Sequence, residues 1–345
     1  MNNHQFISGN EAVVLGALGA GAEIMYGYPI TPATEILESW IETASKDKTL
    51  KYLQTEDETS AGFGVIGSIL AGVKAFTASA GPGHILLQDP LAMAENLRLP
   101  FVAIIMQRGG PSTGTVNFSQ QEVNLAAFGG NGDGLRVVYS ASDVRELYHL
   151  VAKAFSTAWK YRFPTIVLGD GYLAKIKTNV ILDKPLRPIK SKPILDIDGR
   201  ITHLRNCYSS EEQFGVVLRK NISEWKMQIN RIAQSENYLC ADADEILIAH
   251  GLVAGACREA VDILRSENKK FGLFRAITLN PLDRYQLIKN LKNKKKAYIV
   301  ESSLNQFAHI VKYEAYGENV PIIEISKPAE SFTAEEIISS VLRII

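Results

Sequence analysis

Short apolar segments of strand length recur along the chain and alternate with segments of helical period. Runs of this kind are typical of buried strands, and their alternation with helices predicts an open parallel sheet covered on both faces. Thr333 and Glu336 have the spacing of a capping box at the start of the last helix. In the C-terminal third the strand candidates are 245–249, 271–276, 297–302 and 321–326.

The N-terminal half repeats this alternation on a larger scale. A proline-rich stretch and then a polar helical stretch ending near Asn237 separate the two halves. We therefore predict an α/β protein with two doubly wound, mostly parallel-sheet domains, at 1–178 and 244–345, joined by a connection over 179–243. The strand candidates of the first half are 23–29, 74–79, 100–107, 135–140 and 164–170.

Composition narrows the function classes. The 345 residues are 46% hydrophobic, and 37 basic side chains balance 37 acidic ones, so no net charge favours nucleic acid or anionic lipid. The glycine-rich run 59–73 is too short to span a membrane. The N-terminus lacks a basic targeting region, and Cys207, Cys240 and Cys257 form no CxxC pair. These features predict a cytoplasmic protein with free thiols and no iron–sulfur or zinc site of its own.

Four polar or glycine-rich loops follow strand candidates in the first half. Ligands of open parallel sheets bind beyond the carboxyl ends of the strands, so we expect these loops to share one site. Neither a P-loop nor a GxGxxG motif is present, which argues against nucleoside triphosphates and dinucleotides. The loops are GYPITP (27–32), QTEDETSAG (54–62), SAGPGH (79–84) and QRGGPSTG (107–114).

In the first loop, Thr31 stands directly before Pro32 and a helix-like segment. Proline favours the first helical turn, so Thr31 is predicted at the N-cap. It could simply cap the helix. It could also hydrogen-bond a carboxylate or carbonyl at the helix N-terminus, and the two roles are compatible.

The second loop carries Glu56, Asp57 and Glu58. An acidic first turn that favours the helix dipole accounts for two of them. Glu58 instead shares a helix face with the apolar positions 62, 65, 66 and 69. Burial there would raise its pKa, which suits a carboxyl that donates or shares a proton.

Arg108 ends an apolar strand in the fourth loop. Alone it would be a solvated arginine beside a turn. As part of a cluster of loops it becomes a clamp for a small carboxylate. His84, in the third loop, receives no role.

Several motifs in register resemble the α subunit of the 2-oxoacid:ferredoxin oxidoreductases. The resemblance covers nearly the whole chain and rests on YPITP (28–32), TEDETSAG (55–62), SAGPG (79–83), RGGPSTG (108–114), GGNGD (129–133), LNPL (279–282) and VESSLNQ (300–306).

This resemblance implies thiamine diphosphate chemistry. Such enzymes decarboxylate a 2-oxoacid oxidatively, pass electrons through iron–sulfur clusters to ferredoxin, and give the acyl group to coenzyme A. The first domain would bind the cofactor's pyrimidine, and a transketolase-C-like domain would follow. Glu58 matches the family's catalytic glutamate at pyrimidine N1′, and Thr31 and Arg108 match its substrate-binding residues. The implied cofactor-binding residues are Tyr28, Pro29, Ile30, Glu58, Gly81 and Gly83.

The chain lacks the family pattern that holds the diphosphate and its metal. GDG occurs at 132–134 and 169–171, but Asn179 and Asn206 stand at the wrong distance after the second copy. We therefore expect no metal on this chain. Diphosphate, Mg²⁺ and iron–sulfur clusters are expected on partners: a thiamine-diphosphate-anchoring β subunit, and possible γ and ferredoxin-like δ subunits, in a dimer of heteromers.

Alternatives stay open at this point. GGNGD favours a branched-chain 2-oxoacid such as 2-oxoisovalerate, and 2-oxoglutarate is the other candidate. The chain could instead be the pyrimidine-binding β chain of a lipoamide-linked dehydrogenase, although YPITP and RGGPSTG argue for the ferredoxin branch. A non-catalytic assembly subunit of the same fold would not be expected to retain Thr31, Glu58 and Arg108 together.

Overall fold

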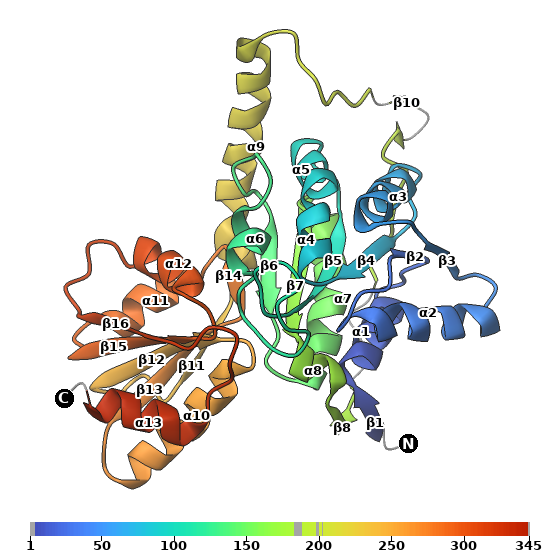
Figure 1. Cartoon of the computed structure of the whole chain (residues 1–345). Helices are drawn as coiled ribbons and strands as arrows, with labels where there is room; N and C mark the ends of the chain where they lie inside the picture. The colour runs from blue at the N-terminus through green and yellow to red at the C-terminus, as the bar shows by residue number, and fades with distance from the viewer. Residues whose placement is uncertain (1–3, 183–187, 198–199, 202, 344–345) are drawn as a thin grey trace.

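The computed structural model describes residues 4–182, 188–197, 200–201 and 203–343. It contains two α/β units, and the C-terminal one lies beside the edge of the first sheet where that sheet ends in β14 (Figure 1). The predicted α/β class with two mostly parallel sheets is confirmed.

The first sheet has seven strands, all parallel except β14. Its central strand, VAIIMQ, is fully buried because both faces of the sheet are covered. Val102, Ile104 and Met106 enter one core, and Ala103 and Ile105 enter the other. In spatial order the strands are β14 (Thr278–Asn280), β6 (Val137–Ser140), β7 (Thr165–Asp170), β5 (Val102–Gln107), β4 (Ala75–Ser79), β2 (Ile24–Gly27) and β3 (Lys51–Gln54).

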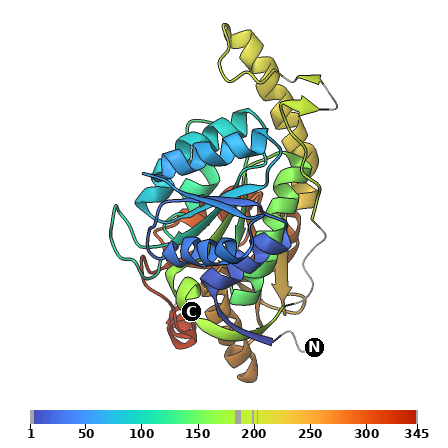
Figure 2. The same cartoon turned by 90° about the vertical axis from the view of Figure 1, so that its right-hand side faces the viewer.

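Two helical layers cover this sheet (Figure 2). The first layer packs around Trp40 and Phe155, and the second around Ile69 and Leu91. Helices of the first layer are α1 (Gly9–Gly19), α2 (Thr34–Lys46), α7 (Val144–Tyr161) and α8 (Gly171–Lys175). Helices of the second layer are α3 (Glu58–Leu70), α4 (Pro82–Leu86), α5 (Gln88–Asn96) and α6 (Val123–Phe128).

The second sheet has five strands, and only β11 is antiparallel. Helices α10 (Val253–Ser266) and α13 (Ala334–Arg343) pack on one face, and α11 (Arg284–Leu291) and α12 (Gln306–Glu314) on the other. The predicted capping box is confirmed, because Thr333 and Glu336 exchange both bonds at the start of α13. In spatial order the strands are β11 (Ser235–Tyr238), β13 (Phe271–Ala276), β12 (Glu245–His250), β15 (Lys296–Glu301) and β16 (Ile322–Ser326).

The segment between the sheets is more regular than its prolines predict. Strand β8 (Lys177–Ile181) pairs with β1 (His4–Ser8), and β9 (Asp196–Ile197) pairs with β10 (Arg200–Ile201). The polar helix expected to end near Asn237 is α9 (Glu211–Ile232), and Asn237 itself lies in β11. The domain limits at 178 and 243 stay a prediction.

No helix in the described part of the chain combines the length and apolar character needed to cross a bilayer. The three cysteines are free, and Cys240 and Cys257 are buried.

Candidate active site

Four loops meet at one edge of the first sheet. They follow β2, β3, β4 and β5, which are adjacent parallel strands, so their carboxyl ends point the same way. This is the edge at which such sheets bind ligands, and the sequence-predicted residues gather there.

Glu58 is the first residue of α3, and its side chain turns inward. Only 3% of the residue is exposed, whereas Glu56 is exposed and Asp57 caps the helix by accepting from the Ser60 N–H at 2.7 Å. Glu58 Oε1 accepts from Ser79 Oγ at 3.3 Å. Burial raises the pKa of Glu58, and the hydrogen bonds it accepts and the charge of Arg108 do not cancel that effect. The predicted burial and pKa direction are confirmed.

Two glycines let the neighbouring loop approach this carboxyl. A Cβ on Gly83 would lie 1.9 Å from Glu58 Oε1 and 2.3 Å from Ser79 Oγ. Gly81 has φ +51°, and a Cβ there would lie 2.5 Å from Arg108 Nε. Any larger side chain at either position would displace a predicted site residue.

Arg108 is 6% exposed and lies across Gly81. Its Nη1 donates to the Thr31 carbonyl at 2.8 Å, while Nε is buried and has no partner within the described chain. A buried guanidinium N–H without an acceptor is costly, so this donor is suited to an external anion or carbonyl.

The prediction that Thr31 caps the following helix is wrong. Helix α2 begins at Thr34, with Ala33 at the N-cap, and Thr31 and Pro32 lie in a turn with a cis peptide bond between them. Their carbonyls are occupied by tertiary donors, Arg108 Nη1 and Asn10 Nδ2, in place of helical N–H groups. The Thr31 side chain caps no helix and is exposed.

Tyr28, Pro29 and Ile30 form the outer rim of the first loop. Tyr28 and Pro29 are exposed and Ile30 is half-buried. Further large apolar side chains are exposed on the elements that frame the site, which is characteristic of a surface that another chain covers. These side chains are Tyr52, Leu53, Phe63, Ile85 and Leu86.

Sequence reasoning missed Glu122 and gave His84 no role. Glu122 is 5% exposed and His84 is fully buried, with Oε2 of the one 2.8 Å from Nδ1 of the other. Glu122 stands eight residues after the QRGGPSTG loop, directly before a helix, and this position was the available signal.

The two GDG copies differ. Asp133 is exposed, whereas Asp170 is buried and caps α8 by accepting from the Leu173 N–H at 2.9 Å. Burial raises the pKa of Asp170 to about 7. Within the described residues, no group of three or more acidic, histidine or cysteine side chains could hold a metal ion.

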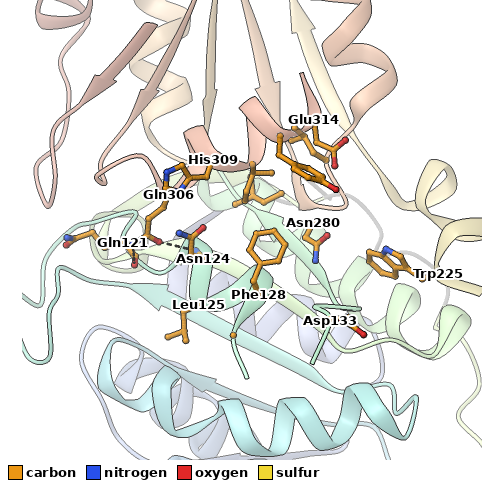
Figure 3. Close-up of a pocket in the computed structure, with 15 residues that line it drawn as sticks. Gln121, Asn124, Leu125, Phe128, Asp133, Trp225, Asn280, Gln306, His309 and Glu314 are labelled. Carbon is orange, nitrogen blue, oxygen red and sulfur yellow. Dashed lines mark hydrogen bonds between the residues drawn. The ribbon is translucent and has the colours of Figure 1, made fainter. Parts of the chain in front are cut away.

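A separate pocket lies between α6 and α12 (Figure 3). It measures about 990 Å³, and none of the predicted site residues lines it. Asp133 and Glu314 line it without any lysine or arginine, so it does not suit a carboxylate substrate. The other lining residues are Gln121, Asn124, Leu125, Phe128, Gly129, Trp225, Leu279, Asn280, Leu282, Gln306, His309, Ile310 and Tyr313.

Two family models match the chain. Residues 15–211 match the thiamine-diphosphate-binding domain of pyruvate flavodoxin/ferredoxin oxidoreductases, and residues 243–330 match core domain II of pyruvate:ferredoxin oxidoreductase.

Curated relatives agree with these matches. Ketoisovalerate oxidoreductase subunit VorB of Methanothermobacter marburgensis is 32% identical, over 92% of each chain. The 2-oxoglutarate synthase subunit KorA of Methanocaldococcus jannaschii is 31% identical, over 89% of this chain and 91% of its own. These relatives do not favour the lipoamide-linked or the non-catalytic alternative.

Solved structures show the same arrangement. The 2-oxoglutarate:ferredoxin oxidoreductase of Magnetococcus marinus, with 2-oxoglutarate, coenzyme A and succinyl-CoA bound, superposes with a TM-score of 0.89 at 27% identity. That match covers 99% of this chain and 65% of the other. A split-gene transketolase, described as an inactive β4 tetramer, shares the fold with a TM-score of 0.62 at 14% identity. This chain therefore belongs to the 2-oxoacid:ferredoxin oxidoreductase family, as an α-type subunit with the thiamine-diphosphate-binding domain followed by core domain II.

Proposed function

We propose that this chain supplies Glu58, Thr31 and Arg108 to the oxidative decarboxylation of a small 2-oxoacid. A partner subunit completes the active site, and coenzyme A accepts the acyl group. One observation carries this proposal. Two groups meet at the same edge of the first sheet: the buried Glu58 carboxyl, whose pKa is raised, and Arg108, whose buried Nε donor has no acceptor within the described residues.

The residues present fit the pyrimidine end of thiamine diphosphate. Glu58 is desolvated, and the absence of side chains at Gly81 and Gly83 lets this loop pack directly against Arg108 and Glu58. When bound, the cofactor supplies a carbon nucleophile and an electron sink. Glu58 would hold a proton at its carboxyl oxygen for the pyrimidine N1′, and burial, which raises its pKa, favours this protonated form.

Arg108 and Thr31 are proposed to hold the substrate. The free Nε donor of Arg108 suits the oxoacid carboxylate, and the exposed Thr31 hydroxyl suits its keto or carboxylate oxygen. The bond from Arg108 to the Thr31 carbonyl fixes the two groups relative to each other. Orientation of this kind contributes several kcal/mol to catalysis.

Partner chains are proposed to carry what this chain lacks. The apolar rim around Tyr28, Leu53 and Ile85 is the surface that a thiamine-diphosphate-anchoring β subunit would cover. Diphosphate, Mg²⁺ and the iron–sulfur clusters are assigned to that subunit and to possible γ and ferredoxin-like δ subunits, in a dimer of heteromers that reduces ferredoxin. The resemblance of the whole chain to multi-subunit oxidoreductases supports this assignment.

The substrate is proposed to be 2-oxoisovalerate or a related branched-chain oxoacid, or else 2-oxoglutarate. The two curated relatives are named for these two kinds of activity, and the GGNGD sequence favours the first.

The test is to copurify the chain with its native partners and assay coenzyme A-dependent reduction of methyl viologen with a panel of 2-oxoacids. A clear preference for one oxoacid supports the proposal. An intact complex without activity on any oxoacid would overturn it. Thiamine diphosphate binding, measured by calorimetry with and without the partner, separates a cofactor defect from a substrate defect.

A further inference from the structure

Glu122 is the residue before α6, and its carboxylate turns back toward the candidate site. Oε1 accepts from the backbone N–H of Gly81 and from that of Arg108, both at 3.0 Å. Oε2 lies 2.8 Å from Nδ1 of His84. The two oxygens of one buried carboxylate therefore contact three groups from two loops, namely the N–H groups of Gly81 and Arg108 and the ring of His84.

These bonds tie together two loops that the sheet alone leaves separate. Gly81 lies beyond the end of β4 and Arg108 directly follows β5, and the last paired residues of these strands are Ser79 and Ile105. Past that pair no ladder bond fixes the distance between the loops. The Glu122 carboxylate bridges them at this point.

The bridge bears directly on the Arg108 side chain. That side chain lies across Gly81, and its Nη1 donates to the Thr31 carbonyl while Nε stays free. An arginine side chain has considerable rotamer freedom, and a guanidinium recognises a carboxylate only in a defined orientation. Fixing the Arg108 and Gly81 backbones together restricts the guanidinium before the substrate arrives.

We propose that Glu122 is a positioning residue for substrate binding, acting through Arg108, and that His84 holds the Glu122 carboxylate in place. This inference rests on the proposed function, in which Arg108 binds the oxoacid carboxylate. Glu122 itself does not touch the substrate in this scheme, so its removal should weaken substrate binding more than it slows turnover.

The test uses the copurified complex with Glu122→Gln. We expect KM for the preferred oxoacid to rise about tenfold, while kcat falls less than about threefold. Glu301→Gln is the matched control, because Glu301 is also buried and accepts from the N–H groups of Phe307 and Ala308 and from Ser303 Oγ. Both variants should lower the thermal midpoint, but only Glu122→Gln should raise KM.

A double variant identifies the route of the effect. In an Arg108→Ala background, Glu122→Gln should raise KM no further, since the group it positions is gone. Additive effects would overturn the proposal, as would a KM unchanged by Glu122→Gln while Arg108→Ala raises it. If Arg108→Ala alone leaves KM unchanged, the proposed role of Arg108 fails and this inference falls with it.

Two further measurements keep the test decisive. If Glu122→Gln does not assemble, Glu122→Asp keeps the charge but is one methylene too short to reach both loops, and an unchanged KM in that variant overturns the proposal. Hydrogen exchange read by mass spectrometry gives a readout independent of activity. Peptides containing the Gly81 and Arg108 amides should exchange faster in the Glu122 variants, and unchanged protection would contradict the bridge.

Discussion

The carboxyl edges of the two sheets carry similar residues but use them differently. In the second sheet, Glu301 accepts from three donors, and Arg275 donates to Glu146, Glu236 and Ser142. In the first sheet, and among the residues that the structure describes, Glu58 accepts from one side chain at 3.3 Å and Arg108 Nε has no acceptor. Strand-end geometry is therefore common to both edges. Unused hydrogen-bonding capacity distinguishes Glu58 and Arg108 from Glu301 and Arg275.

The strongest test of this contrast is Glu58→Gln. Turnover by the copurified complex should fall roughly 10²- to 10⁴-fold, because the amide cannot supply the proton, while the complex stays assembled. Viologen reduction and gel filtration measure the two properties. Glu56→Gln, at an exposed neighbour, should change little, and an equal loss from both variants would mean that the carboxyl is misassigned.

Arg275→Ala tests the carboxyl edge of the second sheet, where Arg275 pairs with Glu146, through the free energy of unfolding. Burial alone would raise the pKa of Glu146, but the bonds and charge of Arg275, together with the hydrogen bonds from Ser142, outweigh burial and lower that pKa. Removing Arg275 leaves this carboxylate buried without its partner, which should cost about 3 kcal/mol in the free energy of unfolding of the full chain. Urea unfolding measures it. Arg284→Ala, which removes a more exposed pair with Glu314 at 3.5 Å, should cost less than about 1 kcal/mol.

Asp170→Asn tests a buried carboxyl beside the proposed site through its pH dependence. The folded state raises the pKa of Asp170 from 3.8 to about 7, so it binds the proton more tightly than the unfolded state. Stability from this group is therefore present below about pH 4 and is lost as pH rises to about 7. Asparagine also caps helices. The stability of the variant should therefore increase relative to that of the native chain over this interval, by about 4 kcal/mol above pH 7.

Urea midpoints of both chains at several pH values measure this difference. Asp143→Asn is the matched control, because Asp143 caps α7 in the same way, through the Glu146 N–H, but is exposed. That variant measures the effect on stability of the same aspartate-to-asparagine exchange at an exposed helix cap. Parallel curves for Asp170→Asn would contradict the prediction.

Arg108→Ala should mainly raise KM for the oxoacid, by roughly 10- to 100-fold, since a hydrogen bond to a charged group contributes about 1.5–3 kcal/mol. Arg98→Ala serves as the control, because Arg98 donates to the Arg162 and Tyr161 carbonyls and to Glu224 within the chain. That variant should lose stability without a change in KM. An unchanged KM for Arg108→Ala would remove Arg108 from the substrate site.

The sequence determined the repeating strands, the parallel sheets and the burial of Glu58, because each depends on a local period that survives in any context. The apolar run from Val102 to Gln107 predicts a buried strand from its own composition. Helical geometry places Glu58, Val65 and Ile69 on one face of α3. The order of the motifs also indicated the family.

Only the tertiary structure decided the features that depend on distant partners. Strands β11 and β14 each add an antiparallel strand at the edge of a sheet, by pairing with β13 and β6. No local sequence pattern specifies these two pairings. Thr31 does not occupy the N-cap position of α2. Its carbonyl instead accepts a hydrogen bond from Arg108, which lies 77 residues away in the sequence. Glu122 acquires its position through donors 14 to 41 residues away. Sequence period sets which face a residue occupies, whereas hydrogen bonds between loops are set by the packed sheet that brings those loops together.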